Sequence, residues 1–171
     1  MSLPPWVEPE RAYDFDDVVR ATTTAQPLFR SRATQEAYRS HMERLRSEWR
    51  SVEDFLQHRV FKCAVVTLDD GRLAAAPLSD EDRLGFVVDG HCVRFCHNDF
   101  PYDLNGVEHF VLWSRDGPLD AATIEALLDH FIADKSRARA WYLNPPQMRS
   151  VTGLFHVQVY VVVSAFAPAE P

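Results

Sequence analysis

The chain has 171 residues, a length that suits a single domain, and hydrophobic residues make up 46% of it, which is enough to form a core. Its formal net charge is −7, and this excess of acid disfavours nucleic acid and anionic membranes as partners, since both require clustered Lys and Arg. Three cysteines do not suggest a disulfide framework, no apolar run reaches the roughly 18 residues of a membrane span, and no signal-peptide pattern opens the chain. We therefore expect one cytoplasmic domain over residues 1–171, and the composition does not determine its oligomeric state.

Residues 14–59 have the hydrophobic periodicity of helices and follow a proline-marked tail at 1–12. One predicted helix presents a single apolar face, formed by Tyr38, Met42, Leu45 and Trp49. Ser51, followed three residues later by Asp54, resembles a capping box and predicts the start of a further helix.

Residues 62–163 have the alternation of strands, interrupted by a helix at 120–134 and followed by a tail at 165–171. Two hairpin turns are predicted, one at 69–71 and one at Asp89-Gly90. This order of elements predicts an α+β fold, in which N-terminal helices pack with a mostly antiparallel sheet and one long crossing helix.

The last predicted strand alternates between valines on one face and His156, Gln158 and Tyr160 on the other. Two interpretations are open: this polar face is exposed to water, or it forms the floor of a pocket. A water-exposed strand would more often carry Lys, Glu or Thr, so we favour the pocket.

A loop at 144–153 precedes this strand and contains two prolines, which restrict its backbone. Its Asn144, Arg149 and Ser150 are suited to face an anion or a carbonyl group. The alternative is a stiff turn in which Asn144 bonds to its own backbone.

A third segment, at 97–113, adds the candidates Asn98, Asp99, Tyr102, His109 and Trp113. A lone histidine at the start of a strand is usually structural, but here a second histidine is expected in the same sheet. Asp99 and Asp103 either face the pocket or cap the turn around Pro101, and capping is the favoured role.

A metal site is not expected, although His91, Cys92, Cys96 and His97 lie close together in the sequence. On one strand Cys92 and Cys96 would be roughly 13 Å apart, and a single zinc ion with bonds of about 2.3 Å cannot bind both. The chain also lacks the phosphate-binding and nucleophile motifs of common cofactor enzymes, so we expect no cofactor.

The runs YDFDDVVRA, NDFPYDLNGVEHFVLWS and WYLNPPQMRSVTGLFHVQVYV occur in this order. They resemble the fungal N-acetylglucosamine-induced protein family, a domain of unknown function, over about residues 13–162. This resemblance implies a link to amino-sugar metabolism and no particular reaction.

The second half is also remotely similar to the histidine-triad nucleotide-binding superfamily. The similar features are Phe100-Pro101, His109, the helix at 120–134, Asn144, Arg149-Ser150-Val151 and the run from His156 to Tyr160. In that superfamily the middle histidine of the triad attacks an α-phosphate, and Gln158 occupies the matching position here. An amide cannot form the covalent intermediate, so the resemblance leaves His156 as an acid, a base or a phosphate ligand.

Three functions are therefore open. The first is a binding protein for a nucleotide, sugar nucleotide or sugar phosphate. The second is a phosphoester hydrolase or transferase that uses His156 and His109 but lacks the usual nucleophilic histidine. The third is a protein-interaction module that docks a partner on its N-terminal helices.

Overall fold

The structure, a computed structural model, describes residues 6–24, 26–77, 79, 81, 83, 85–144 and 149–163. The predicted tail at 165–171 and the prolines Pro145 and Pro146 lie outside the described residues. The helices of the described part are α1 (Phe15–Thr24), α2 (Arg32–Glu48), α3 (Val52–Phe61) and α5 (Ala121–Phe131). The strands are β1 (Val65–Thr67), β2 (Leu73–Ala75), β3 (Val87–Val88), β4 (His91–His97), β5 (Val107–Ser114), β6 (Arg139–Tyr142) and β7 (Phe155–Val162).

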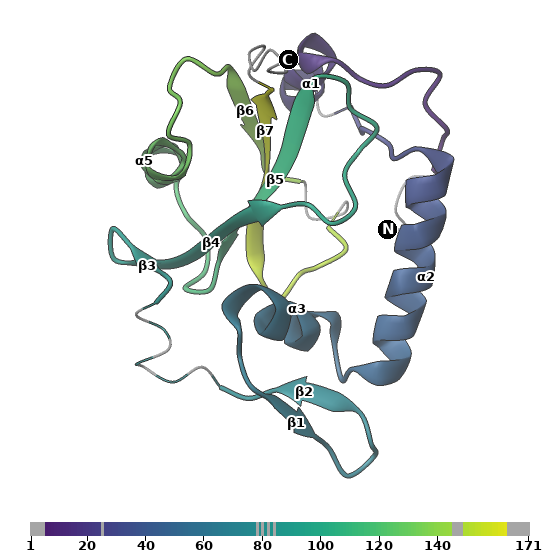
Figure 1. The fold of residues 1–171 in the computed structure, drawn as a ribbon, viewed down its shortest axis with the longest axis vertical. Helices are drawn as coiled ribbons and strands as arrows, with labels where there is room; N and C mark the ends of the chain where they lie inside the picture. The colour runs from purple at the N-terminus through teal and green to yellow at the C-terminus, as the bar shows by residue number, and fades with distance from the viewer. Residues whose placement is uncertain are drawn as a thin grey trace, which may run out of the picture.

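The main sheet has the strand order β3-β4-β5-β7-β6, and each pair of neighbours is antiparallel. Strands β1 and β2 form a separate two-stranded sheet that extends beyond α3 (Figure 1). Both predicted hairpins are present, and the β3–β4 turn has the positive φ angles that favour its sequence, 49° at Asp89 and 81° at Gly90. The α+β prediction is confirmed.

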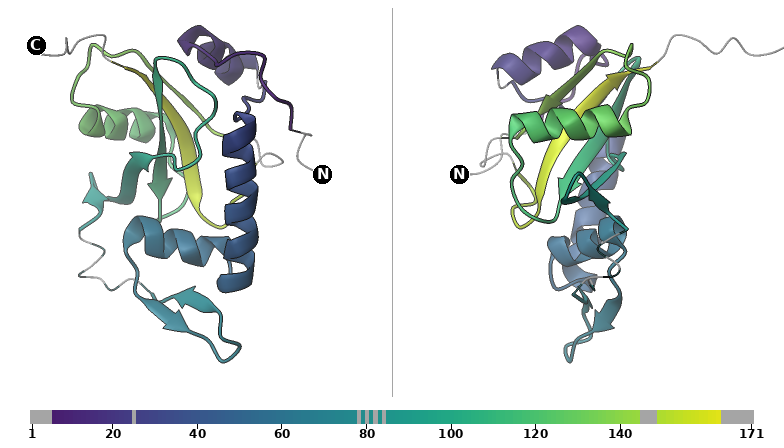
Figure 2. Two further views of the ribbon diagram at one scale, coloured as in Figure 1. Left: turned by 45° about the vertical axis from the view of Figure 1, so that its right-hand side comes forward. Right: turned by 90° about the vertical axis from the view of Figure 1, so that its left-hand side faces the viewer.

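One face of the main sheet is covered by α5, which lies across the strands (Figure 2). The valines of β7 form its core together with the apolar face of α5, and the fully buried members include Val157, Val159, Leu127 and Leu128. The alternation predicted for the last strand is thereby confirmed on its valine side. This face of the sheet therefore carries apolar packing.

The opposite face of the sheet is partly covered by α2 and α3 (Figure 2). The predicted apolar face of α2 is confirmed, because Met42, Leu45 and Trp49 form a buried cluster against which Tyr38 and Phe55 pack. Helix α3 closes the lower part of this face. The polar side chains of β7 therefore lie beneath helices and not in open water.

The start of α3 has the predicted cap. The Ser51 hydroxyl accepts a hydrogen bond from the Asp54 amide (3.0 Å), and Asp54 in turn accepts from Arg50 and from the Ala75 amide of β2 (3.1 Å). Burial alone would raise the pKa of Asp54, but the hydrogen bonds from Arg50, Ser51 and Ala75 together lower it. One buried carboxylate thus joins the first turn of α3 to the β1–β2 hairpin.

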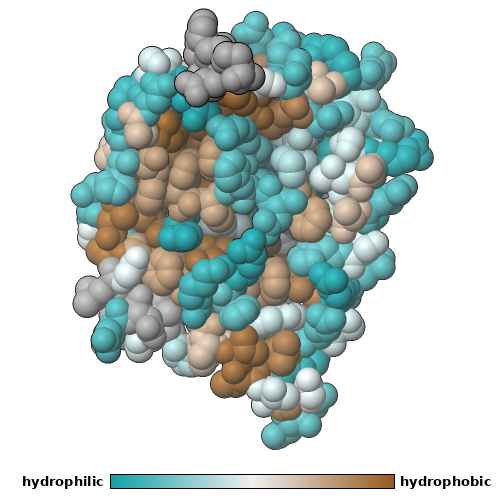
Figure 3. Space-filling model, in the orientation of Figure 1, coloured by the Kyte–Doolittle hydropathy of each residue, from teal (hydrophilic) through white to brown (hydrophobic). Residues whose placement is uncertain are grey.

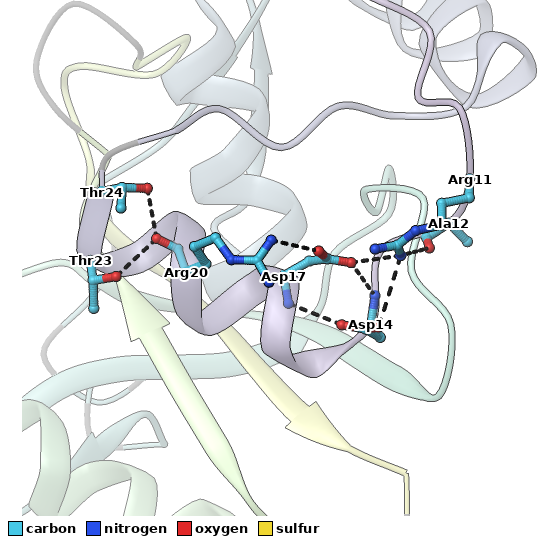
Figure 4. A network of polar contacts seen from close by, with 7 residues as sticks. All are labelled: Arg11, Ala12, Asp14, Asp17, Arg20, Thr23 and Thr24. Carbon is cyan, nitrogen blue, oxygen red and sulfur yellow. Dashed lines mark hydrogen bonds and ion pairs between the residues drawn. The ribbon is translucent and has the colours of Figure 1, made fainter.

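Helix α1 begins with a reciprocal cap made of two aspartates. The Asp17 amide donates to Asp14 (3.0 Å) and the Asp14 amide donates to Asp17 (3.1 Å), while Arg11 and Arg20 form ion pairs with Asp17 (Figure 4).

No helix among the described residues is long and apolar enough to cross a membrane.

Candidate functional site

A cavity of about 270 Å³ lies between α2, α3 and the polar face of the sheet. We call it the central cavity. Its floor is formed by Trp113 of β5 and by His156 and Gln158 of β7. These three meet because His156 pairs with Trp113 across the two strands and Gln158 pairs with Val111, so their side chains share one face.

The amide of Gln158 is held in one orientation. Its Oε1 atom accepts from His109 Nε2 (2.7 Å) and from Asn98 Nδ2 (3.4 Å). His109 Nδ1 accepts from the Tyr102 amide (3.3 Å), so the ring hydrogen must be on Nε2. Because Oε1 is engaged in this way, the NH₂ group of Gln158 is the part of the amide that remains for another partner, and no described residue bonds to it.

His109 is neutral and lies beneath the cavity. Burial lowers its pKa to about 4, although the hydrogen bond to Gln158 raises it. Its ring stacks on Tyr102 (5.0 Å between centroids) and on Tyr160 (4.7 Å). The structure therefore brings His109 and His156 to the same face of the sheet but does not bring His109 to the cavity wall.

His156 has one engaged nitrogen. Nδ1 lies 3.0 Å from the Leu154 carbonyl oxygen, which can only accept, so the proton of the neutral ring is on Nδ1. Burial lowers the pKa of His156 although this hydrogen bond raises it, and the charge of Arg149 lowers it further. No described residue bonds to Nε2, which leaves an acceptor on a ring that is 8% exposed and borders the central cavity.

Cationic side chains surround the cavity. Among the described residues that line it are four cations, Arg30, Arg59, Lys62 and Arg94, and one carboxylate, Asp99. Arg59 forms an ion pair with Asp99 (3.3 Å). The other three cations form no ion pair with a described carboxylate, so the local charge is positive although the whole chain carries a net charge of −7.

Aromatic rings form the wall on the side of α2. The centroid of the His41 ring lies 5.0 Å from that of Phe100 and 5.4 Å from that of Phe55. Tyr38 packs edge-on against Phe100, with 5.5 Å between the ring centroids. Asn98 fixes the Phe100 turn by accepting a hydrogen bond from its amide (2.9 Å). The turn-capping role favoured for the neighbouring aspartates is thus taken by Asn98.

Ser150 reaches the cavity because its segment is anchored to α3. The Glu53 carboxylate accepts from the amides of Gly153 (3.1 Å) and Thr152 (3.4 Å). A side chain at 153 would meet Glu53, since a Cβ atom there would lie 2.9 Å from its Cγ. A glycine at this position therefore allows the segment to approach the helix.

Two of the three residues predicted for the 144–153 loop lie elsewhere. Asn144 borders a very small void, of about 10 Å³, together with Tyr102 and Tyr160. Arg149 borders a separate cleft that His156 also lines, and its Nε donates to the Asn144 carbonyl (2.7 Å). The central cavity therefore unites Asn98, Asp99, Trp113, Ser150, His156 and Gln158, and it does not include Tyr102, His109, Asn144, Arg149 or Tyr160.

The four cations were not among the site residues predicted from the sequence, and neither was Cys96, whose thiol also lines the cavity. One signal was present: Arg94 alternates in phase with Cys92 and Cys96 on β4 and pairs with Trp113, so it had to share the polar face. No local pattern points to Arg30, which is 70 residues away from its partner, the Phe100 carbonyl.

The molecular surface has distinct hydrophilic and hydrophobic regions (Figure 3). Hydrophilic side chains gather between β4 and α3, whereas hydrophobic surface covers the base of the β1–β2 hairpin, where Val65 and Val66 are exposed (Figure 3).

Within the described part of the chain, no group of His, Cys, Asp and Glu side chains is arranged to hold a metal ion.

Comparison with known proteins identifies a family without assigning a function. Residues 14–162 match the model of the family described as "Protein of unknown function (DUF3605)". No curated protein and no solved structure matches the chain.

Proposed function

Since the chain belongs to the DUF3605 family, whose description names no activity, we propose a function from the central cavity itself: binding of a small phosphorylated ligand. The ligand class is that of nucleotides, sugar nucleotides and sugar phosphates. The observation that carries the proposal is the group of cations around a polar floor in a chain whose net charge is −7.

Phosphate recognition is supported by the lack of carboxylate partners for three of these cations. Arg30, Lys62 and Arg94 have no carboxylate partner among the described residues, and an anion in the cavity would supply one. Charge-assisted hydrogen bonds of this type are stronger than neutral ones. Arg30 is already positioned, because its Nε donates to the Phe100 carbonyl (2.8 Å) and its guanidinium lies over the Tyr38 ring (4.3 Å).

Two sequence features refine the proposal. The resemblance to N-acetylglucosamine-induced proteins supports amino-sugar phosphates as members of the ligand class. The free thiols of Cys63, Cys92 and Cys96 suit a reducing compartment, which supports the cytoplasmic location expected from the sequence.

The first test is thermal unfolding of the protein with a panel of nucleotides, sugar nucleotides and amino-sugar phosphates. A ligand at about 100 times its dissociation constant adds about 2.7 kcal/mol to the free energy of unfolding, which corresponds to a shift of several degrees for a chain of this size. A panel without any shift would contradict the proposal and favour a protein-interaction role for the N-terminal helices.

Arg94→Gln tests the position of the phosphate. We expect affinity for a phosphorylated ligand to fall by about 10-fold or more, because one charge-assisted hydrogen bond is lost. Arg46→Gln is the matched control, since Arg46 is exposed on the last turn of α2 and does not line the cavity. Equal losses in the two variants, measured by calorimetric titration, would show that only the overall charge matters.

Cys96 supplies an independent readout of where the ligand sits. It lines the cavity, whereas Cys63 and Cys92 are buried, with 2% and 0% of their surface exposed. Bound ligand should slow alkylation of Cys96, followed by peptide mass spectrometry, and leave the other two thiols unchanged. A ligand that shifts the melting temperature without protecting Cys96 binds elsewhere.

An enzymatic role is the second candidate, favoured by the state of His156. A neutral ring whose Nδ1 donates to a carbonyl presents Nε2 as a proton acceptor, as a general base requires. In this proposal the phosphoester hydrolase or transferase lacks the usual nucleophile, because Gln158 stands in the middle triad position, and His109 acts only by positioning Gln158. His156→Gln should then abolish turnover while binding persists; equal loss of both would contradict a role in proton transfer.

A further inference from the structure

Among phosphorylated ligands, we infer that this cavity selects a phosphomonoester of a single polyhydroxylated ring, with the phosphate among the cations and the ring hydroxyls on the floor. This inference rests on the proposed function and specifies its ligand. It follows from the size of the cavity and from two polar groups on β7 that have no hydrogen-bond partner among the described residues.

The first group is the NH₂ of Gln158. The side chain is 7% exposed, and its Oε1 is held by His109 and Asn98, so the amide cannot rotate to present its oxygen without breaking both hydrogen bonds. No described residue accepts from the NH₂ group, and Gln158 lines the central cavity. The floor therefore offers a donor of fixed position.

The second group is Nε2 of His156, an acceptor two residues away on the same face of the same strand. Its proton lies on the opposite nitrogen, held by the Leu154 carbonyl. The Cα atoms of positions 156 and 158 are separated by roughly 7 Å along the strand, a span that neighbouring substituents of one small ring can bridge. The floor thus presents one donor and one acceptor side by side.

A hydroxyl group matches this pair because it donates and accepts at once. A fully ionised phosphate oxygen only accepts, so it cannot satisfy His156 Nε2. The phosphate is better placed among Lys62, Arg94 and Arg30, where acceptors are needed. Polarity alone therefore orients the ligand, with its anion toward the cations and its hydroxyls on β7.

Size favours one ring over a nucleoside. The cavity measures about 270 Å³, just below the range of about 300–1,000 Å³ typical of small-molecule sites. A nucleotide must fit a base, a ribose and a phosphate, whereas a sugar phosphate must fit one ring and a phosphate. The buried indole of Trp113 gives that ring an apolar surface beside the polar pair.

The test compares three probes by calorimetric titration: glucose 6-phosphate, phenyl phosphate and adenosine monophosphate. Phenyl phosphate keeps the phosphate and a six-membered ring but has no hydroxyls. We expect glucose 6-phosphate to bind at least about 10-fold more tightly than either of the others, since phenyl phosphate has no hydroxyls for the floor groups and adenosine monophosphate must fit a base as well as a ribose.

Gln158→Glu sharpens the comparison. The carboxylate keeps an acceptor for His109 and Asn98 but replaces the NH₂ donor by an oxygen. The added charge weakens all phosphates alike, so the readout is the affinity ratio of glucose 6-phosphate to phenyl phosphate, which should differ from that of the wild type, because the ring hydroxyls now meet two acceptors in place of a donor and an acceptor. Gln57→Glu is the matched control, because Gln57 accepts from Arg115 and does not line the cavity, and its ratio should equal that of the wild type.

His156→Phe supplies a second variant should Gln158→Glu not fold, and the ratio should fall toward one, because phenylalanine keeps a ring at this position but has no acceptor for a hydroxyl. Equal wild-type affinity for glucose 6-phosphate and phenyl phosphate, or tighter binding of adenosine monophosphate, overturns this inference and leaves phosphate binding intact. Binding of none of the probes, together with a panel that produces no thermal shift, overturns the proposed function itself.

Discussion

At the scale of residues, the determining contact of the site is the hydrogen bond from His109 to Gln158. It sets the tautomer of a buried histidine and the orientation of a buried amide together. Protonation of His109 would place a second N–H against the Tyr102 amide, which already donates to Nδ1. His109 therefore contributes to folding only when it is neutral.

This gives a pH prediction for the free energy of unfolding. The pKa of His109 is about 4 in the folded chain and about 6.5 in an unfolded one, so between these values the unfolded state binds more protons. The contribution of neutral His109 is fully present above about pH 6.5 and declines as the pH falls toward 4, by up to about 1.4 kcal/mol per pH unit.

Urea unfolding of the wild type and of His109→Asn at pH 7 and pH 5 measures this effect. The stability advantage of the wild type over the variant should shrink at the lower pH. His130→Asn is the matched control for the substitution itself, since His130 is exposed on α5 and does not contact the cavity floor. An advantage of His109 that is independent of pH would contradict the prediction.

At the scale of elements, α3 links stability to the cavity. Its N-terminal cap joins Ser51, Asp54 and the β1–β2 hairpin, and its inner face supplies several cavity-lining side chains, Val52, Phe55, Leu56, Arg59 and Val60. Glu53 in its first turn also anchors the segment that carries Ser150. The start of one helix therefore organises two walls of the site.

Ser51→Ala should lower the free energy of unfolding by about 1 kcal/mol, the usual cost of losing a serine N-cap. It should also loosen the first turn of α3, which hydrogen exchange of its amides would detect. Ser47→Ala is the control, because the Ser47 hydroxyl donates to the Arg44 carbonyl on the exposed side of α2, away from any cap. A Ser51 variant as stable as this control would show that the cap hydrogen bond is not needed.

At the scale of the whole molecule, the sheet separates two functions. The α5 face is a continuous apolar core, whereas the α2–α3 face contains the cavity and its polar floor. Packing on one face can hold the strands while the other keeps open space. The free energy of unfolding and the selectivity for ligands should therefore respond to substitutions on different faces of the sheet.

Leu127→Ala tests this separation. Leu127 is fully buried in α5, and its truncation should cost about 2–5 kcal/mol in urea unfolding. The affinity ratio of the ligand probes should not change, because the strand register that places His156 and Gln158 is preserved. Val163→Ala, at a position 46% exposed, should cost no more than about 0.5 kcal/mol. A changed ratio in the Leu127 variant would show that the two faces are coupled.

Much of the fold followed from patterns that are local in the chain. The alternation of β7, the apolar face of α2, the Ser51 cap and the Asp89-Gly90 turn each depend on residues a few positions apart, and each is present in the structure. The same alternation correctly placed His156 and Gln158 on one face. The amino-acid sequence alone therefore determined the elements, the α+β class and the polar face of the last strand.

Tertiary structure decided which residues share the cavity. Arg30 approaches the Phe100 carbonyl across 70 residues, and His109 meets Gln158 across 49. Such contacts depend on how helices pack over the sheet, and periodicity within a segment carries no information about its partner. For this reason the predicted group of site residues was divided between the central cavity, a small void and a separate cleft. For the same reason the cations that surround the cavity emerged only when α2, α3 and β4 came together in space.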